Sequence, residues 1–539
     1  MSNVVSLSSF SGENDHALFA NAMAYLREHP NTTLVVEPRV YDIGTPLSRK
    51  TMEDVISGVY GNNPEGAMFS PDFAYSSGVS LEGQSGTTVI ADGATLMIDG
   101  FMEPLTLLNC ENITVKGLTI DHKRKPYSQG IISDLKWRSK AEGTGSFIVT
   151  FGEEFPTCES TPIPRYIAYD PYANRQVYYG EYRVMRREYL GDNRWKFSFK
   201  NLKHDLTGME FYVWHTFHYR PAILIENAVN TILENVTIHS QPGMGIVAHR
   251  DTDIRISGLR VVPSTGSHMS TNTDATHFTS CKGTVRVENS VFEGQGDDSI
   301  NIHTFYHSID KTGDCTCTTY LQAPGKTHSQ TADYPDPGDI LELTDMNSLS
   351  VVDTYRVISR EATESPWKSK LVLDKPLPAD CTDLAFANAT QMPRLEFVGN
   401  FCRSHIARSV LVKIKDALIE DNTIMDVVGT GIYIAAEAWW FEGLCTTENI
   451  EIHRNRIVHC GRMGNAARPR GCAGICVTID ANNPTAATHK HVVIEDNIVD
   501  CPESPHGVYV SNAVEAIVQR NHITSSDEPV VVEPVPTRK

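Results

Sequence analysis

The chain has 539 residues, of which 40% are hydrophobic and 21% are charged, and its formal net charge is −19. This composition is typical of a globular protein long enough to bury a large core, and no apolar run approaches the roughly 20 residues of a membrane span. The acidic balance argues against nucleic acid, an anionic membrane or an acidic polysaccharide as a partner, because binding these needs a basic surface. A neutral partner fits the charge best.

The first ten residues have neither a basic n-region nor a long apolar segment, so we expect no signal peptide. The chain as written is then cytoplasmic, or secreted or periplasmic if a signal was removed. The chain has 12 cysteines, whereas a dense disulfide framework belongs to short secreted chains. We interpret the cysteines as buried free thiols stacked at one turn of a solenoid rather than as metal or redox ligands.

Residues 13–29 are predicted to form a helix, because apolar residues recur at helical spacing at Leu18, Phe19, Met23 and Leu26. Asn14 or Asp15 can cap its start, and Pro30 ends it. A strand-like run follows over residues 33–43. A capped helix before such a strand resembles the opening of pectate-lyase-like β-helices, in which the helix covers the first coil.

A repeated unit is the strongest signal in the chain. Copies begin at residues 110, 227, 252, 283, 416, 449, 491 and 515, and each has alternating residues, a turn at Asn or Gly, and a second short strand. The turn residue recurs at Asn235 and Gly258, at Asn400 and Asn422, and at Asn497 and Asn521. Asn and Gly tolerate the left-handed conformation that such a corner needs. A period of about 23 residues with β alternation predicts an all-β parallel β-helix.

Two stretches lack the repeated unit and are predicted to be small inserted antiparallel β domains, barrel-like in form. The expected order is an N-terminal cap with the first coils over residues 1–123, an insert over 124–215, and central coils over 216–303. A second insert follows over 304–395, and the C-terminal coils cover 396–539. The inserts leave the solenoid on either side of the central coils, where they would wall a site.

The central coils carry three acidic residues at their corners. Asp274 precedes Asp297 and Asp298 by 23 and 24 residues, which is one coil. Three carboxylates this close repel, so at least one should have a raised pKa and stay protonated near neutrality. A protonated acid beside an ionised one can cleave a glycosidic bond, because one donates a proton to the leaving oxygen and the other activates water. The competing interpretations are turn formers or a calcium site.

Strand alternation also predicts which neighbouring side chains point inward. Thr276 and Phe278 are expected to stack inside on Ile300 and Ile302, whereas His277 stacks outside on Asn301, and His303 shares an outward column with His249, Thr279 and Lys413. Trp439 and Trp440, beside Glu437, would form a sugar platform, or else pack against an insert. Arg403 and Arg408 on the following coil are weaker candidates. The predicted substrate-binding residues are His277, Asn301, His303, Glu437, Trp439 and Trp440.

The segments Asn272-Thr-Asp and Gly296-Asp-Asp look like the Asp motifs of polygalacturonase-type hydrolases. With the two inserts and the segments beginning at Leu118 and Gly431, the chain more closely resembles glycoside hydrolase family 110, the α-1,3-galactosidases that remove terminal α-galactose. This resemblance implies a right-handed β-helix and an exo-acting, inverting hydrolase that needs no cofactor or metal. Its substrate would be an oligosaccharide or glycan ending in α-galactose.

The resemblance also assigns roles to the three acidic residues. Asp297 would be the general acid, with Asp274 and Asp298 holding the attacking water, although Asp274 stays open as the acid. One alternative is a polygalacturonase-like hydrolase or a calcium-dependent lyase or epimerase acting on uronic-acid polymers, which would need a basic groove; the nearest basic string is Lys413-Ile-Lys415. A non-catalytic glycan-binding β-helix is a second alternative, and a homodimer is left open.

Overall fold

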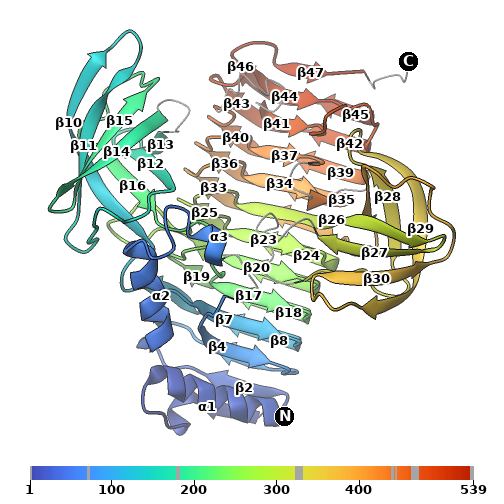
Figure 1. The fold of residues 1–539 in the computed structure, drawn as a ribbon, viewed down its shortest axis with the longest axis horizontal. Coiled ribbons are helices and arrows are strands. Elements are labelled where there is room, and N and C mark those ends of the chain that lie inside the picture. Colours follow the sequence, from blue (N-terminus) through green and yellow to red (C-terminus); the bar gives the residue numbers. More distant parts are fainter. Residues whose placement is uncertain are drawn as a thin grey trace.

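The computed structural model describes residues 3–68, 73–177, 183–321, 332–438, 442–443, 446–462 and 473–534. Short strands stack in parallel into three long sheets, with the N-terminus at one end of the stack and the C-terminus at the other (Figure 1). Each strand pairs in parallel with the corresponding strand of the next coil, so the predicted parallel β-helix is confirmed. Among the described helices, none is both long and apolar enough to cross a membrane.

The strands of the three sheets follow one another from the N-terminal to the C-terminal end of the stack. The first sheet contains β1 (Asn3–Ser6), β2 (Thr32–Val35), β5 (Thr88–Ile90), β8 (Glu111–Lys116), β18 (Val229–Glu234), β21 (Thr252–Ser257), β24 (Lys282–Glu288), β32 (Arg394–Val398), β35 (Asp416–Glu420), β39 (Thr447–His453), β42 (His489–Glu495) and β45 (Ala513–Gln519). The second contains β3 (Val40–Gly44), β6 (Thr95–Asp99), β9 (Thr119–His122), β19 (Thr237–Ile238), β22 (Arg260–Val261), β25 (Val291–Glu293), β33 (Phe401–Arg403), β36 (Thr423–Met425), β40 (Arg456–Val458), β43 (Ile498–Cys501) and β46 (His522–Ser525). The third contains β4 (Ser77–Glu82), β7 (Glu103–Leu108), β17 (Ile223–Glu226), β20 (Ile246–His249), β23 (Thr276–Thr279), β26 (Ile300–Gly313), β34 (Val410–Lys413), β37 (Ile432–Ile434), β41 (Ala473–Val477), β44 (His506–Val510) and β47 (Val530–Val532).

The inward residues of these strands form one continuous apolar core along the stack. On the first sheet, for example, Ile254 and Ile256 of β21 lie in register with Val285 and Val287 of β24, and all four are buried. Successive residues of a strand point to opposite sides, so the alternation read from the sequence selects the side chains that fill the coil. Each coil therefore rests mainly on its two neighbours.

One helix covers the N-terminal end of the stack, and two others lie along its side (Figure 1). The predicted helix is α1 (Asp15–Glu28), and the side chain of Asn14 caps it by accepting a hydrogen bond from the Ala17 amide at 2.9 Å. Its apolar face joins the core of the coils through Phe19, Met23 and Leu26. The strand-like run 33–43 is two strands, β2 and β3, separated around Pro38. The 3₁₀ helix η1 (Leu7–Ser9), α2 (Pro46–Ile56) and α3 (Glu65–Met68) were not predicted from the sequence.

The corners between coils partly contradict the sequence prediction. Asn235 and Gly258 adopt the expected left-handed conformation, with φ of 53° and 65°. On the later coils the prediction is wrong, because the left-handed φ belongs to the preceding residues, which are Gly399, Asp421, Asp496 and Arg520. The Asn side chains instead form a ladder, in which the oxygen of the first Asn accepts from the Ser290 amide and each later oxygen accepts from the backbone and side-chain amides of the Asn on the previous coil. The ladder comprises Asn400, Asn422, Asn455, Asn497 and Asn521.

Two antiparallel β units project from opposite sides of the solenoid (Figure 1). The first is a sheet in the order β13-β12-β16-β10-β11-β15-β14, and in the second the strands β26-β27-β30-β29-β28-β31 close into a six-stranded barrel. Strand β26 begins in the coil and continues into the barrel, so the two parts share one backbone. The added strands are β10 (Tyr127–Ser139), β11 (Thr144–Phe151), β12 (Arg165–Asp170), β13 (Arg175–Val177), β14 (Arg183–Gly191), β15 (Arg194–Lys200), β16 (Glu210–Trp214), β27 (Thr316–Leu321), β28 (Ile340–Asp345), β29 (Ser350–Ala362), β30 (Lys368–Leu373) and β31 (Leu384–Asn388).

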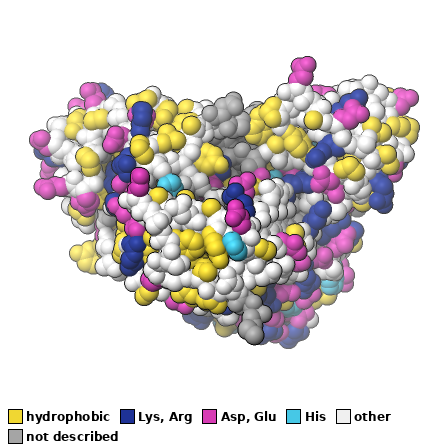
Figure 2. Space-filling view, turned by 90° about the horizontal axis from the view of Figure 1, so that it is seen from below, with side chains coloured by type: hydrophobic (Ala, Val, Ile, Leu, Met, Phe, Trp, Pro, Cys, Tyr) yellow, Lys and Arg dark blue, Asp and Glu magenta, His cyan; other side chains and the backbone are white. Residues whose placement is uncertain are grey.

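The surface carries charges of both signs. On the face in Figure 2, seen from below relative to Figure 1, the described Lys and Arg side chains are interspersed with Asp and Glu. The ten described cysteines are all free thiols, and most are buried. This agrees with the interpretation of the cysteines as packed side chains.

Candidate active site

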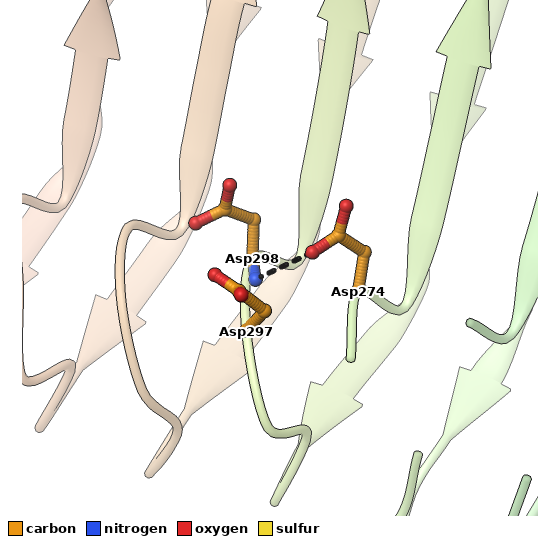
Figure 3. Close-up of side chains that lie close together, drawn as sticks. All are labelled: Asp274, Asp297 and Asp298. Atoms are coloured by element: carbon orange, nitrogen blue, oxygen red, sulfur yellow. Dashed lines mark hydrogen bonds between the residues drawn. The ribbon is translucent and has the colours of Figure 1, made fainter. Parts of the chain in front are cut away.

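The three acidic residues meet at one corner of the stack, between the second and third sheets. Asp274 lies just before β23, and Asp297 and Asp298 lie just before β26, the next strand of the third sheet. One carboxylate oxygen from each lies within 4.8 Å of the others. Figure 3 shows the carboxyl groups of Asp274 and Asp298 side by side on adjacent coils, with Asp297 pointing in another direction.

Close backbone packing accounts for the glycine before the acidic pair. A Cβ atom on Gly296 would lie 2.1 Å from the Asn272 carbonyl oxygen and 3.3 Å from the Trp214 ring. Only glycine therefore lets these two corners approach each other while the first insert, which supplies Trp214, packs against them. This packing brings the insert up to the acidic corner.

The predicted stacking of the two strands is confirmed. Thr276 and Phe278 lie opposite Ile300 and Ile302, and His277 lies opposite Asn301. His303 lies opposite Thr279 on one side and Lys413 on the other, and Thr279 lies opposite His249. The outward residues His277, Asn301 and His303 are nevertheless at most 3% exposed, and their polar atoms contact other protein groups. Sugar contact by these three residues stays a prediction.

Arg408 holds the carboxyl group of Asp298. The Arg408 amide donates to Oδ1 at 2.8 Å and its Nη2 donates to Oδ2 at 3.0 Å, so both oxygens of Asp298 accept hydrogen bonds. Burial raises the pKa of Asp298 well above its usual value, and the Asp297 and Asp274 charges add to this rise. The Arg408 guanidinium opposes this rise in the pKa of Asp298, and two hydrogen bonds donated to one carboxylate favour its ionised form.

Asp274 is held by its neighbours in a different way. Its Oδ1 accepts a hydrogen bond from the Asp298 amide at 3.1 Å, and its Oδ2 lies 2.6 Å from Nδ1 of His277. The Nε2 atom of His277 lies 2.9 Å from Nε2 of His303, and Nδ1 of His303 lies 2.7 Å from the Thr304 carbonyl oxygen. Asp274 therefore begins a continuous series of buried hydrogen-bonding groups.

Asp297 is the most open member of the trio. Its side chain is partly exposed, and no donor in the described residues hydrogen-bonds its carboxyl group. Burial, and then the negative charge of Asp274, raise the pKa of Asp297. Arg408, Arg165 and His218 pull the pKa the other way but do not outweigh the first two causes. A carboxyl group that is protonated and open to the solvent side can donate its proton to a bound molecule.

A second group of buried charges lies beside the trio on the following coils. Lys413 of β34 pairs with Glu437 at 2.9 Å and with Glu442 of β38 (Glu442–Gly443), and its Nζ also donates to Asn301 at 3.3 Å. Burial acts to raise the pKa of Glu437, but Lys413 and Arg408 lower it below its usual value. Glu437 is thus buried and paired with a lysine inside the protein, and its role in sugar binding stays a prediction.

Several neighbours of the trio were missed or ranked low from the sequence. Glu442 and His405 were not singled out, although His405 lies 3.1 Å from the Asp297 carbonyl oxygen and 3.0 Å from the Ser299 hydroxyl. Arg408 was a weak candidate, and the structure places it on Asp298. Arg403 lies away from the trio and donates to the Asn174 carbonyl in the first insert at 3.3 Å. Trp439 and Trp440 lie outside the described residues.

Among the described residues, the trio is the one group whose ligand atoms are close enough together to be considered for a metal ion. Both oxygens of Asp274 and both oxygens of Asp298 already take part in hydrogen bonds with the protein. Protein groups, including the Arg408 guanidinium, therefore orient these two carboxyl groups, and we do not assign the trio as a metal site. The arrangement fits acid and base chemistry instead.

Curated relatives agree with the resemblance stated from the sequence. The chain is 25% identical to the α-1,3-galactosidase B of Bacteroides fragilis over 495 residues, which cover 84% of this chain and 80% of the relative. It is 26% identical to an α-1,3-galactosidase B of Phocaeicola vulgatus, with 92% and 87% covered. It is 22% identical to the α-1,3-galactosidase A of Bacteroides thetaiotaomicron, with 92% and 86% covered. The predicted resemblance to α-1,3-galactosidases is thus confirmed.

Protein-family models and solved structures are less informative than the curated relatives. No protein-family model matches the chain. Among solved structures, the exopolygalacturonase of Thermotoga maritima matches with a TM-score of 0.38 and 11% identity, covering 98% of this chain and 92% of that one. The family 28 exopolygalacturonase of Yersinia enterocolitica matches with a TM-score of 0.32 and 11% identity, covering 100% and 80%.

Proposed function

We propose that this chain is an exo-acting, inverting glycoside hydrolase that removes terminal α-1,3-linked galactose from oligosaccharides or glycans. The observation that carries the proposal is the trio of carboxyl groups, which lie within 4.8 Å of one another in three different environments. Carboxyl groups whose surroundings push their pKa values apart can divide the work of acid and base. The names of the curated relatives support galactose as the sugar.

Asp297 is assigned as the general acid. Each of the other two carboxyl groups has a donor that favours its ionised form, namely Arg408 for Asp298 and the Asp298 amide for Asp274. Asp297 accepts no hydrogen bond from a donor in the described residues and its side chain is partly exposed, so a proton on it can reach the leaving oxygen. The pKa is raised for both Asp297 and Asp298, so the contacts and the exposure carry this assignment. Asp274 and Asp298 then hold the attacking water, and one of them takes up its proton.

A neutral sugar fits the cations of this site better than a uronic acid does. Recognition of a substrate carboxylate needs an available cation. In the string Lys413-Ile-Lys415, Lys413 pairs with Glu437 and Glu442, and Lys415 pairs with Glu342 at 3.2 Å. Arg408 is likewise paired with Asp298. These three pairings support a galactoside over a pectin-like substrate, whereas Arg165, which also acts on Asp297, stacks on the Phe217 ring and pairs with no carboxylate in the described residues.

Inversion is the part of the proposal that rests on resemblance to the family. Inverting sites usually separate their two carboxyl groups by about 6.5–9.5 Å, and retaining sites by about 5–5.5 Å. The 4.8 Å limit on the nearest oxygens of the trio does not select between these mechanisms, because it is measured between single atoms and three groups share the work. The stereochemistry of the product must therefore be measured.

The test is proton NMR of the purified protein with galactosyl-α-1,3-galactose and without added metal. Release of galactose that appears first as the β anomer is the expected result. The Asp297→Asn variant should lose about 10²–10⁴-fold in turnover while it still binds the sugar. Asp380→Asn, on the exposed surface of the second insert, is the matched control. Galactose appearing first as the α anomer would overturn inversion, and no release would overturn the proposed activity.

A further inference from the structure

Protons can be counted along the buried series that starts at Asp274. The series contains three contacts: Asp274 Oδ2 to His277 Nδ1 at 2.6 Å, His277 Nε2 to His303 Nε2 at 2.9 Å, and His303 Nδ1 to the Thr304 carbonyl at 2.7 Å. We call Asp274, His277 and His303, with this carbonyl, the imidazole series. Each contact is short enough for a hydrogen bond, and each hydrogen bond needs one hydrogen.

The fixed end of the series is the Thr304 carbonyl. A carbonyl oxygen only accepts, so Nδ1 of His303 must carry a hydrogen. The contact between His277 and His303 needs a second hydrogen, and the contact between His277 and Asp274 needs a third. Two neutral imidazoles supply only two hydrogens. A fully hydrogen-bonded series therefore holds one proton more than two neutral histidines and an ionised Asp274.

We propose that the imidazole series holds this extra proton beside Asp274, and that His277 and His303 are positioning residues that keep Asp274 able to act as a base in the proposed hydrolysis. With the proton on His277, an imidazolium compensates the charge of Asp274. Arg408 compensates the charge of Asp298 in the same way. Asp297 is then the member of the trio without a cation hydrogen-bonded to it in the described structure, which fits its role as the acid. The inference rests on the proposed function for the role, but not for the proton count.

Surrounding groups favour the Asp274 end of the series as the position of the extra proton. Burial lowers the pKa of His303 well below its usual value, and the attraction of Glu442 does not offset this, so His303 stays neutral. Glu442 Oε2 lies 3.9 Å from Nε2 of His303, beyond hydrogen-bond distance. In the described residues, Asp297 and Asp298 act on Asp274, Lys413 acts on His303, and Arg408 acts on the two neighbouring carboxyl groups.

The first experiment compares two substitutions of His303 in the full chain. His303→Gln keeps an oxygen that can accept from Nε2 of His277, whereas His303→Leu fills similar space without an acceptor. Without the acceptor the imidazolium is less stable, the pKa of Asp274 rises beside two carboxyl groups, and the base ionises only at higher pH. We expect His303→Leu to move the acid limb of kcat/KM upward by about one pH unit or more, with KM changed less than about twofold because the His303 side chain is fully buried and acts through His277.

The outcomes separate a positioning role from a merely structural one. His303→Gln should keep the acid limb close to that of the wild type, and His489→Gln, a substitution at a buried histidine outside the trio, should leave it in place. Equal losses for His303→Gln and His303→Leu at every pH, with the acid limb unmoved, would overturn the proposal.

A second measurement needs no substrate. In protein labelled with ¹⁵N-histidine, both ring nitrogens of His277 should carry or share a proton near neutral pH, assigned by the loss of these signals in His277→Asn. A His277 ring with one proton-free nitrogen that forms no hydrogen bond would overturn the proton count. This readout holds even if the wild-type protein releases no galactose, so it distinguishes failure of the series from failure of the proposed activity.

Discussion

At the scale of single residues, the acid and base roles proposed for the trio require three neighbouring carboxyl groups to differ in protonation. Arg408 makes the largest favourable charge contact with Asp298, whose pKa burial raises. Replacing Arg408 with Gln removes this opposing effect, so the pKa of Asp298 rises further. A carboxyl group that must be ionised then ionises only at higher pH, and the acid limb of kcat/KM should move upward by about 1–3 pH units.

The pH–rate profile of Arg408→Gln should be measured beside two other variants. Arg408→Lys keeps the positive charge but loses the paired geometry, so its shift should be smaller. Arg403→Gln lies one strand away and contacts the first insert, so its acid limb should match the wild type. A thermal melt shows whether each variant is folded. An unmoved acid limb in a folded Arg408→Gln protein would exclude Asp298 as a group that must be ionised.

The residues of the trio and their stacking could be predicted because one coil separates them in sequence. Register between β23 and β26 follows from the period and the alternation, and both are visible in the sequence. Lys413 was placed from the sequence by its column with His303, but Arg408 and Glu442 could not be assigned as partners in the same way, since the second insert separates them from Asp298 by more than 100 residues. Because an insert of any length can end at the start of the next coil, the number of residues between Asp298 and a later residue does not predict whether the two are in contact.

At the scale of the elements, the asparagine ladder holds the corners of the later coils in register. The side chain of Asn422 accepts from the Asn400 amide at 2.8 Å, and it donates to the Phe397 carbonyl and the Asn455 side chain, each at 2.9 Å. The sequence shows that Asn recurs at these corners, and we predicted from it that the Asn residues adopt the left-handed backbone conformation. Periodicity identifies the position at which Asn recurs. A recurring Asn can be either a buried side chain that forms hydrogen bonds or a turn residue in the left-handed conformation, and the sequence does not distinguish them.

Replacing Asn422 with Ala should therefore be costly. The substitution leaves the buried amide of Asn400 and the Phe397 carbonyl without a partner, and each such loss costs about 1–3 kcal/mol. The free energy of unfolding measured in urea should fall by that amount or more. Asn449→Ala, at an exposed position on the neighbouring coil, should change it by less than about 0.5 kcal/mol. Equal effects of the two substitutions would show that the ladder does not stabilise the corners.

At the scale of the whole molecule, the stability of each coil in the parallel stack depends mainly on the adjacent coils. Each coil contacts chiefly its neighbours, so stability is approximately a sum of coil terms and nearest-neighbour terms. The helix α1 covers the N-terminal end and places Leu26, which is fully buried, against the first coils. The trio lies before β23 and β26, which are several coils from this end (Figure 1), and the second insert leaves the stack from β26. A substitution at the N-terminal end should therefore destabilise the first coils without changing the geometry of the trio.

Replacing Leu26 with Ala tests this separation, because the cavity should cost about 2–5 kcal/mol at the end of the stack. Hydrogen exchange, followed by mass spectrometry, should show lost protection in β2, β4 and β5 and unchanged protection in β23, β34 and β35. Turnover of the galactoside at low temperature should match the wild type, since the trio and its partners keep their places. Protection lost evenly along all three sheets would mean that the solenoid unfolds as one cooperative unit, and the trio would then depend on coils that it never touches.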